Sequence, residues 1–256
     1  MKNSKIAWTD NTFNPWWGCV RVSEGCIHCY AETFSKRTGN DIWGVDKPRR
    51  FFGDKHWNEP VKWNTEAQKE GKRKFVFCAS MADWAEDRDD LIAPRERLCK
   101  LIEDTPWLTW LLLTKRIENV VNVVPDGWLN GAPKNAWFGV TTENQKRYDE
   151  RIDYLLELRE HLDASRVWLS VEPQIEHIDL REKRADWVIV GGESGTGCRP
   201  FKIEWARDMK EQCASLGIPF FMKQLGGNPN KRDEMMDFPE DLRIREFPEQ
   251  VTSLPP

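Results

Sequence analysis

Short apolar runs recur along the middle of the chain, and they predict buried strands. Each run opens on an aromatic or β-branched residue, is apolar on both faces and ends in polar or small residues. A strand of a parallel sheet that is covered on both sides has this pattern. The six runs occupy residues 75–81, 110–116, 137–143, 167–173, 187–193 and 220–224.

The segments between these runs have helical spacing. The clearest is 144–161, where Tyr148, Ile152, Leu155 and Leu156 form one stripe among charged residues. Two further segments fit a helix, namely 91–102, with Pro94 near its start, and 203–216, with Gly217 as its C-cap. Alternating strands and helices predict parallel β/α units joined by right-handed crossovers.

The strand count predicts an α/β fold, a partial (β/α) barrel of about six parallel strands. A seventh strand follows if 14–18 is extended, and eight would close a full barrel. The length fits one sizeable core. We therefore expect a single domain over 1–225 that begins with a cysteine-rich loop. The proline-rich tail, 226–256, is expected to wrap the barrel or fray.

Composition and charge narrow the class of protein. No run of about 18 apolar residues offers a membrane span, and the first residues lack the apolar core of a signal peptide, so we expect a cytoplasmic protein without membrane contact. The net charge of −4 gives no overall attraction to nucleic acid. Residues 36–74 hold eleven Lys and Arg against six Asp and Glu. A solvated surface explains this surplus better than phosphate binding, and contact with nucleic acid stays open.

Polar residues collect where the predicted strands end. In parallel β/α folds, the reactive groups lie at the carboxyl ends of the strands. The pattern therefore predicts a functional mouth at one end of the barrel. Its members are Ser80, Asp83, Thr114, Lys115, Arg116, Thr141, Thr142, Glu143, Ser170, Glu172, Glu193, Ser194, Lys223 and Gln224.

Three of the seven cysteines, Cys19, Cys26 and Cys29, lie within eleven residues and indicate a metal site. Thiolates suit iron–sulfur clusters and zinc alike. Three ligands would leave one iron of a [4Fe–4S] cluster free. His28 could instead complete a Cys3His zinc site, although its place between Cys26 and Cys29 makes tetrahedral closure difficult. The scattered cysteines fit small buried apolar residues, and they are Cys78, Cys99, Cys198 and Cys213.

A three-cysteine loop ahead of a β/α barrel resembles the radical S-adenosylmethionine superfamily. The resemblance implies that Cys19, Cys26 and Cys29 hold a [4Fe–4S] cluster whose free iron binds S-adenosylmethionine. One electron, from a donor such as flavodoxin or ferredoxin, then cleaves S-adenosylmethionine to a 5′-deoxyadenosyl radical. The spacing here is Cys-x6-Cys-x2-Cys, which departs from the usual Cys-x3-Cys-x2-Cys in its first gap.

More narrowly, the chain is similar to a family of phage and prophage proteins of unassigned function, often described by their cysteine motif. Short motifs spread from the start of the chain to about residue 227 carry this similarity. Leu113-Thr-Lys-Arg and Val171-Glu-Pro also resemble spore photoproduct lyase, which implies a nucleic-acid substrate. The motifs are Asn14-Pro-Trp-Trp-Gly-Cys, Gly25-Cys-x-x-Cys-Tyr-Ala-Glu, Leu113-Thr-Lys-Arg, Ser170-Val-Glu-Pro and Gly191-Gly-Glu-Ser.

The superfamily resemblance implies roles for further residues. Lys115 or Arg116 would bind the carboxylate of S-adenosylmethionine, and Cys198 would donate a hydrogen atom to a substrate radical. His28 fills a position near the adenine that is usually aromatic. The other expected cofactor-binding residues are Tyr30, the ribose-binding candidates Glu143, Glu172 and Glu193, and Gly191 and Gly192, which let a ligand approach the backbone.

Two alternatives remain on sequence alone. The cysteines could hold zinc in a binding module that grips nucleic acid or a partner protein, without catalysis. They could also hold a cluster that only transfers electrons and binds no S-adenosylmethionine. Iron or zinc content, and cleavage of S-adenosylmethionine, separate these interpretations.

Overall fold

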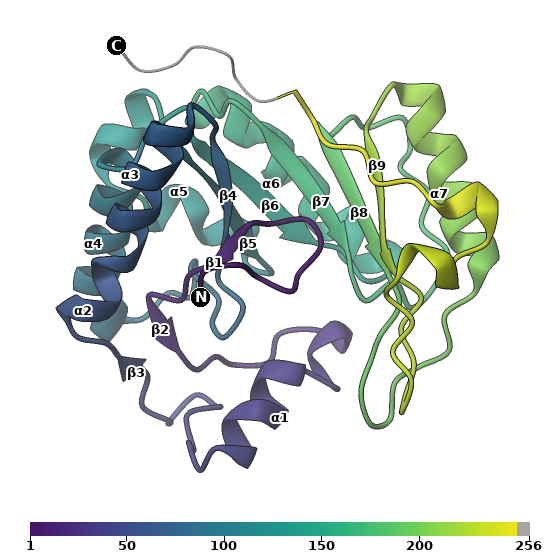
Figure 1. Ribbon diagram of the computed structural model, residues 1–256, viewed down its shortest axis with the longest axis horizontal. Helices are drawn as coiled ribbons and strands as arrows, with labels where there is room; N and C mark the ends of the chain where they lie inside the picture. Colours follow the sequence, from purple (N-terminus) through teal and green to yellow (C-terminus); the bar gives the residue numbers. More distant parts are fainter. Residues whose placement is uncertain (250–256) are drawn as a thin grey trace.

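The computed structural model describes residues 1–249 and shows a curled, seven-stranded parallel sheet (Figure 1). The strands are β1 (Asn11–Thr12), β4 (Lys74–Cys78), β5 (Leu108–Thr114), β6 (Ala136–Thr141), β7 (Val167–Val171), β8 (Trp187–Gly191) and β9 (Phe220–Gln224). They lie in the sheet in chain order, and each pairs in parallel with the next. The predicted α/β partial barrel is confirmed, because all six apolar runs form strands.

The seventh strand is not where the sequence suggested. It is β1, which pairs with β4 in the register Asn11 to Val76. Residues 14–18 leave the sheet, and Trp16–Trp17 forms strand β2 of a separate antiparallel pair with β3 (Arg50–Phe51). Pro15 has no amide hydrogen to give to a ladder, which explains why the parallel pairing ends before it.

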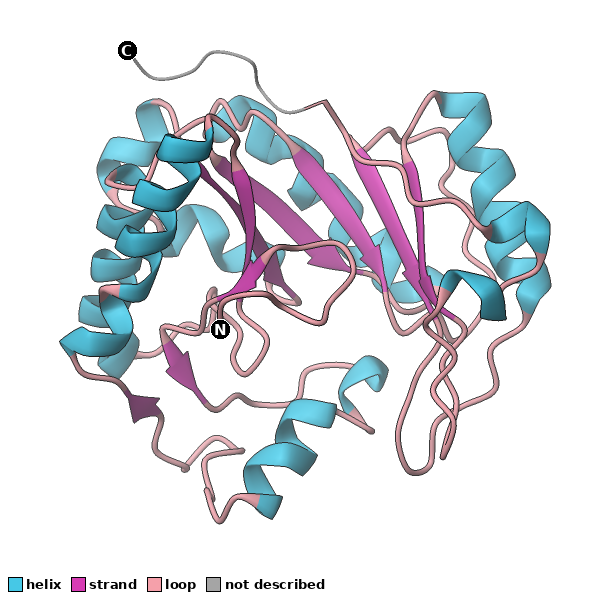
Figure 2. Cartoon of the chain, viewed as in Figure 1, coloured by secondary structure: helices cyan, strands magenta, loops and turns pink. Residues whose placement is uncertain are grey.

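The helices cover the outer side of the sheet, except for the first (Figure 2). They are α1 (Tyr30–Arg37), α2 (Asp54–Trp57), α3 (Glu59–Glu70), α4 (Ile92–Glu103), α5 (Val120–Val123), α6 (Gln145–His161) and α7 (Ile203–Leu216). Short 3₁₀ turns are η1 (Glu24–Cys26), η2 (Asp89–Leu91), η3 (Ile117–Asn119), η4 (Asp126–Asn130), η5 (Met235–Asp237) and η6 (Glu240–Leu242). Helix α1 lies apart, beyond the carboxyl ends of the strands (Figure 1).

The ends of two helices match the sequence prediction. Asn144 precedes α6, and its side chain accepts a hydrogen bond of 2.9 Å from the backbone N–H of Arg147. Gly217 ends α7 with φ 64°, a left-handed conformation that glycine adopts at little cost. Within residues 1–249, no helix is both long and apolar enough to cross a membrane.

Strands β4 to β9 are largely apolar on both faces because they separate two cores. On the outer face, residues such as Val76 and Leu112 join one large cluster with the helices. On the inner face, Trp137, Trp168 and Trp187 form a second cluster that Trp8 closes. Alternate residues of a strand point to opposite faces, so one continuous apolar run serves both cores.

The described part of the tail packs against the barrel. The backbone N–H of Met222 in β9 donates to the carbonyl of Ile244 at 2.9 Å, and Glu246 donates back to Phe220 at 3.0 Å. The side chain of Leu242 is fully buried in the outer core. Residues 226–249 therefore wrap the barrel, whereas 250–256 lie outside the described residues.

The inner core predicts a sensitive glycine. A Cβ atom at Gly139 would lie 2.2 Å from ring atom Cε2 of Trp168. We expect Gly139→Ala to lower the free energy of unfolding by about 3 kcal/mol, because the indole ring must move within a closely packed core. A Cβ atom at Gly127 would meet nothing within 4 Å, so Gly127→Ala should change stability by less than about 0.5 kcal/mol. Urea titrations measure both variants, and equal midpoints would contradict this packing.

Candidate functional site

A cavity of about 730 Å³ lies where the carboxyl ends of the strands face the N-terminal segment. Its floor continues the inner face of the sheet. Phe77, Leu113, Thr141, Ser170 and Lys223 line it, each from a different strand. The volume falls within the range of small-molecule sites. The cavity therefore occupies the mouth that the polar strand ends predicted.

The three clustered cysteines all line this cavity. Cys19 follows β2, Cys26 ends η1 and Cys29 is the N-cap of α1. Burial raises the pKa of Cys29, and the nearby Cys26 raises it further. As the side chains lie, no group of three or more His, Cys, Asp or Glu within residues 1–249 forms a ready metal site.

Seven of the other ten predicted site residues also line the cavity. They are His28, Tyr30, Lys115, Arg116, Glu172, Gly192 and Glu193. Glu143, Gly191 and Cys198 are not among its lining residues in the described part of the chain. The structure thus brings the cysteines together with most of the strand-end residues.

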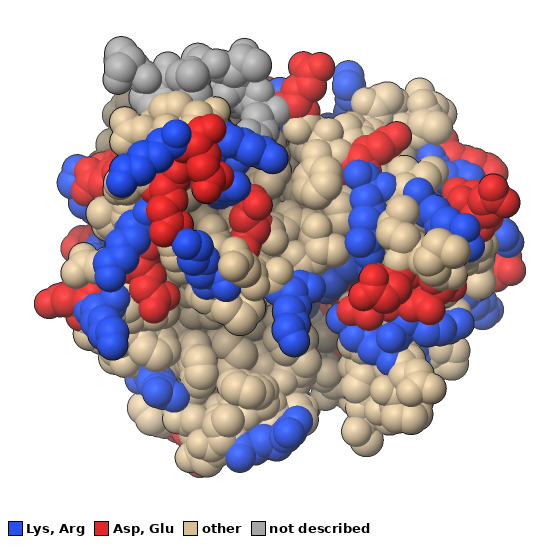
Figure 3. Space-filling model, in the orientation of Figure 1, with Lys and Arg blue, Asp and Glu red and all other residues tan. Residues whose placement is uncertain are grey.

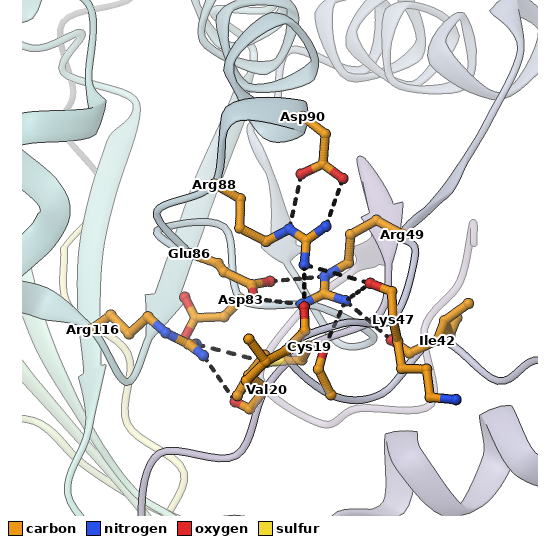
Figure 4. A network of polar contacts seen from close by, with 12 residues as sticks. Cys19, Val20, Ile42, Lys47, Arg49, Asp83, Glu86, Arg88, Asp90 and Arg116 are labelled. Atoms are coloured by element: carbon orange, nitrogen blue, oxygen red, sulfur yellow. Dashed lines mark hydrogen bonds and ion pairs between the residues drawn. The ribbon is translucent and has the colours of Figure 1, made fainter.

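Arg116 connects a buried carboxylate to the first cysteine (Figure 4). One terminal nitrogen lies 2.8 Å from Asp83 Oδ2 and 3.7 Å from the Sγ atom of Cys19. The other donates to the carbonyl of Val20 at 2.8 Å. Asp83 also accepts a 2.6 Å hydrogen bond from the Thr114 hydroxyl. These contacts hold the first cysteine against the ends of β4 and β5.

Burial and the neighbouring charges set the protonation states of Asp83 and Cys19. Burial alone would raise the pKa of Asp83, but the Arg116 guanidinium and the hydrogen bond from Thr114 hold it below its usual range. Burial, with the nearby charge of Asp83, raises the pKa of the Cys19 thiol to about 12. Asp83 is therefore an anion and Cys19 a neutral thiol near neutral pH.

A second buried ion pair supports the same segment (Figure 4). Arg49 binds Glu86 through two nitrogens, at 3.0 and 2.5 Å, and donates to the carbonyl of Lys47 at 2.9 Å. Gly18 fits beside it with φ 112°, and a Cβ atom there would lie 2.5 Å from the carbonyl oxygen of Ile42. Only glycine allows this approach of the chain to residues 42–49.

Glu143 anchors the middle of the cysteine loop. It is fully buried and accepts hydrogen bonds from the backbone N–H of Gly25 at 3.1 Å and from Arg151 at 2.9 Å. Burial alone would raise its pKa, but Lys115 and Arg151 keep it below its usual range. Its observed contacts are with the protein, and its role toward a ribose stays a prediction.

Glu193 anchors the loop at its far side. Arg199 binds both of its carboxylate oxygens, at 2.9 and 2.5 Å, and His28 Nδ1 lies 3.0 Å from Oε2. Arg199 also donates to the carbonyl of Glu24 at 3.0 Å. The Glu24 side chain in turn pairs with Arg147, which lowers its pKa to about 2. Both carboxylate oxygens of Glu193 are therefore already bound by side chains of the protein.

Lys115 and Glu172 differ from these anchors. Lys115 is half-buried in the cavity wall and has no ion-pair partner within residues 1–249. Glu172 is half-buried and forms an ion pair with Lys223. At Gly192, a Cβ atom would lie 2.4 Å from the carbonyl oxygen of Leu225, so packing of neighbouring chain segments explains this glycine.

Sequence reasoning missed the residues that hold the loop in place. Arg49, Arg147, Arg151 and Arg199 each pair with a loop residue or with a carboxylate beside the loop. Nothing in the sequence distinguishes them from surface arginines, because Glu24 lies more than a hundred residues from Arg147. Of the carboxylates that these arginines bind, the sequence pattern indicated only Glu143 and Glu193, as polar strand ends.

The anchoring role of Glu143 is testable. We expect Glu143→Gln to destabilise the protein by about 3 kcal/mol, because Arg151 loses its buried ion-pair partner and Lys115 loses a nearby opposite charge. Hydrogen exchange at residues 19–29 should become faster. Glu160→Gln is the matched control, since Glu160 is exposed on α6, the helix that carries Arg151, and has no ion pair within the described residues.

The pH dependence gives a second readout of the same change. The pKa of Glu143 is lowered from about 4.5 in the folded state, so its contribution is complete above that value. The stability difference between wild type and Glu143→Gln should shrink as the pH falls through the folded-state pKa. A difference that stays constant to pH 3 would contradict the charge-based explanation.

Comparison with known proteins gives one family. A comparison with curated proteins finds no match. A family model described as "Protein of unknown function (DUF5131)" matches residues 3–249, which include every element and every cavity residue described above. The chain therefore belongs to the DUF5131 family.

Proposed function

We propose that this protein is a radical S-adenosylmethionine enzyme. The observation that carries the proposal is that Cys19, Cys26 and Cys29 line one cavity at the carboxyl ends of a partial parallel barrel. Polar strand-end residues, including Lys115 and Glu172, line the same cavity. When bound there, a [4Fe–4S] cluster would pass one electron from flavodoxin, ferredoxin or a similar donor to S-adenosylmethionine and cleave it to a 5′-deoxyadenosyl radical.

The donor set fits such a cluster in kind, and its three thiols line one cavity. Three thiols approach the cavity from two sides, Cys19 from the ends of β4 and β5, and the other two from η1 and α1. The longer first gap of the motif follows from this arrangement, because residues 20–25 must cross the mouth between the two sides. As the side chains lie in residues 1–249, the three thiols do not form a metal-holding group, so cluster binding requires the loop to rearrange.

Cluster binding also requires the cysteine thiols to lose their protons. Burial raises the pKa of Cys19 to about 12 and also raises that of Cys29. Metal ligation needs thiolates, so cluster binding must release these protons. Arg116 beside Cys19 and Lys115 near Cys29 are the cations that favour the thiolate forms. Arg116 thus acts as a positioning residue for a ligand.

The contacts of Arg116 and Lys115 indicate different roles for these two cations. Arg116 is buried, and Asp83, Cys19 and Val20 already engage its terminal nitrogens. Lys115 lies in the cavity wall without an ion-pair partner in residues 1–249. A carboxylate entering the cavity would gain a charge-assisted hydrogen bond from Lys115. We therefore assign Lys115, rather than Arg116, to the carboxylate of S-adenosylmethionine.

Metal analysis tests the proposal directly. Anaerobically reconstituted protein should hold about four irons and be brown, because three thiolates and one open site suit a [4Fe–4S] cluster. With dithionite and S-adenosylmethionine it should form 5′-deoxyadenosine, measured by mass spectrometry. Cys26→Ala should lose both properties. Cys213→Ala, buried away from this cavity, should keep them.

Other outcomes of this experiment identify the alternatives. One zinc and no iron per chain would contradict the proposal and favour a zinc-stabilised binding module. A cluster without 5′-deoxyadenosine formation would indicate an electron-transfer protein. Cys198→Ala tests the predicted hydrogen donor, since unchanged product would remove that residue from the mechanism.

Lys115 gives a sharper test of cofactor binding. We expect Lys115→Met to weaken the affinity for S-adenosylmethionine by roughly 10- to 150-fold, the effect of losing a charge-assisted hydrogen bond of about 1.5–3 kcal/mol. Lys115→Arg should recover most of the affinity. Lys69→Met, an exposed lysine outside the cavity, is the control for lost charge. Equal affinity of Lys115→Met and wild type in calorimetric titrations would contradict the assignment.

A further inference from the structure

We propose that single-stranded nucleic acid binds on the outer surface of the N-terminal segment and runs from there to the mouth of the cavity. The proposal rests on the proposed function, because it names the substrate class of the same site. We call the binding surface the aromatic–basic platform. It comprises Trp17, Phe34, Arg37, Arg50, Phe52 and Lys55.

Rings and cations alternate on this platform. The antiparallel pairing of β2 and β3 places Trp17 opposite Arg50. The Arg50 guanidinium lies 4.7 Å from the centre of the Trp17 ring and 5.4 Å from that of Phe52. Trp17 also meets the edge of Phe34 on α1, at 6.0 Å between ring centres. The helix and the small sheet therefore form one continuous surface.

The cations of the platform are not neutralised by the protein. Arg37, Arg50 and Lys55 are exposed and have no ion-pair partner within residues 1–249. The acidic residues nearby are mostly occupied, since Glu32 pairs with Arg21 and Lys36, Asp41 with Lys47, and Asp54 with Arg97. Among the acidic residues of 30–55, Asp46 alone is exposed and has no ion-pair partner within residues 1–249. Figure 3 shows mainly neutral and basic side chains on the lower lobe, where α1 lies.

One stripe of α1 joins the platform to the cavity. Tyr30, Phe34 and Arg37 stand at positions i, i+4 and i+7, so they share one face of the helix. Tyr30 is 58% exposed and lines the cavity, and Phe34 is 44% exposed. An aromatic–aromatic–basic row therefore leads outward from the cavity mouth.

This pattern fits single-stranded nucleic acid better than a protein partner. Protein interfaces also favour aromatic residues and arginine, but charge is depleted at their cores, whereas this platform carries three exposed cations without an ion-pair partner in residues 1–249. Unpaired bases stack on aromatic and guanidinium planes, and unpaired cations bind the phosphates. A duplex hides its bases from such stacking. The alternation of rings and free cations therefore points to single strands.

The experiment measures the affinity of the whole chain for fluorescent oligonucleotides by anisotropy, with single-stranded DNA, single-stranded RNA and duplex as separate arms. We expect one single-stranded arm to bind more tightly than duplex. Arg37→Glu with Arg50→Glu should weaken binding at least about 10-fold and reduce its salt dependence, by about 0.7 in the slope for each lost phosphate contact. Phe34→Ala should weaken it about 5- to 150-fold, the range for one lost stacked base.

Matched variants control for charge and exposed area. Lys69→Glu with Lys72→Glu makes the same change in net charge on exposed residues outside the platform, and Tyr154→Ala removes an exposed ring from α6. Both should bind as wild type does. Circular dichroism verifies that each variant is folded.

The outcomes separate this inference from the proposed function. Platform-dependent binding by protein that neither holds iron nor cleaves S-adenosylmethionine would support the platform and reject the enzyme. Cleavage of S-adenosylmethionine without oligonucleotide binding would overturn the platform alone. Equal binding of duplex, equal loss in the control variants, or platform-dependent capture of an acidic protein without oligonucleotide binding would also overturn it.

Discussion

The site depends on buried ion pairs that join the cysteine loop to the barrel. Asp83 holds Arg116, and Arg116 contacts Cys19, while Glu143 holds the backbone of Gly25. Each carboxylate is almost fully excluded from solvent, so a missing partner would leave an uncompensated charge in a poorly polar environment. The loop carries few regular elements of its own. Its position is therefore set by charges on the strands that face it.

This arrangement explains why so many strand ends are charged. Some of those charges serve the scaffold, as Glu143 and Glu193 do through Arg151 and Arg199. Others remain available in the cavity wall, and Lys115 is the clearest. The anchoring pairs hold the cysteine loop beside the cavity, and the remaining strand-end groups line its wall. The proposed cofactor site and the proposed platform lie side by side, because Tyr30 of α1 lines the cavity and Phe34 of the same helix belongs to the platform.

Most of the fold could be predicted from the sequence because it depends on local periodicity. All six apolar runs are strands, the helix expected over 144–161 is α6, and α7 ends at Gly217, the predicted C-cap. The seventh strand was misplaced because β1 is two residues long and carries no period of its own. Its pairing with β4 decides that these residues, and not 14–18, complete the sheet.

The sequence by itself determined the class of fold, and it predicted that the three cysteines and the polar strand ends would lie at one end of the barrel. These conclusions follow from alternation, spacing and the common direction of parallel strands, which act over short stretches of chain. Only the tertiary structure decided which charged residues are anchors and which face the cavity. Arg147 meets Glu24, and Arg199 meets both Glu193 and the Glu24 backbone, across long stretches of chain. Such pairings depend on how the strands and crossovers bring distant segments together, and no local pattern records that.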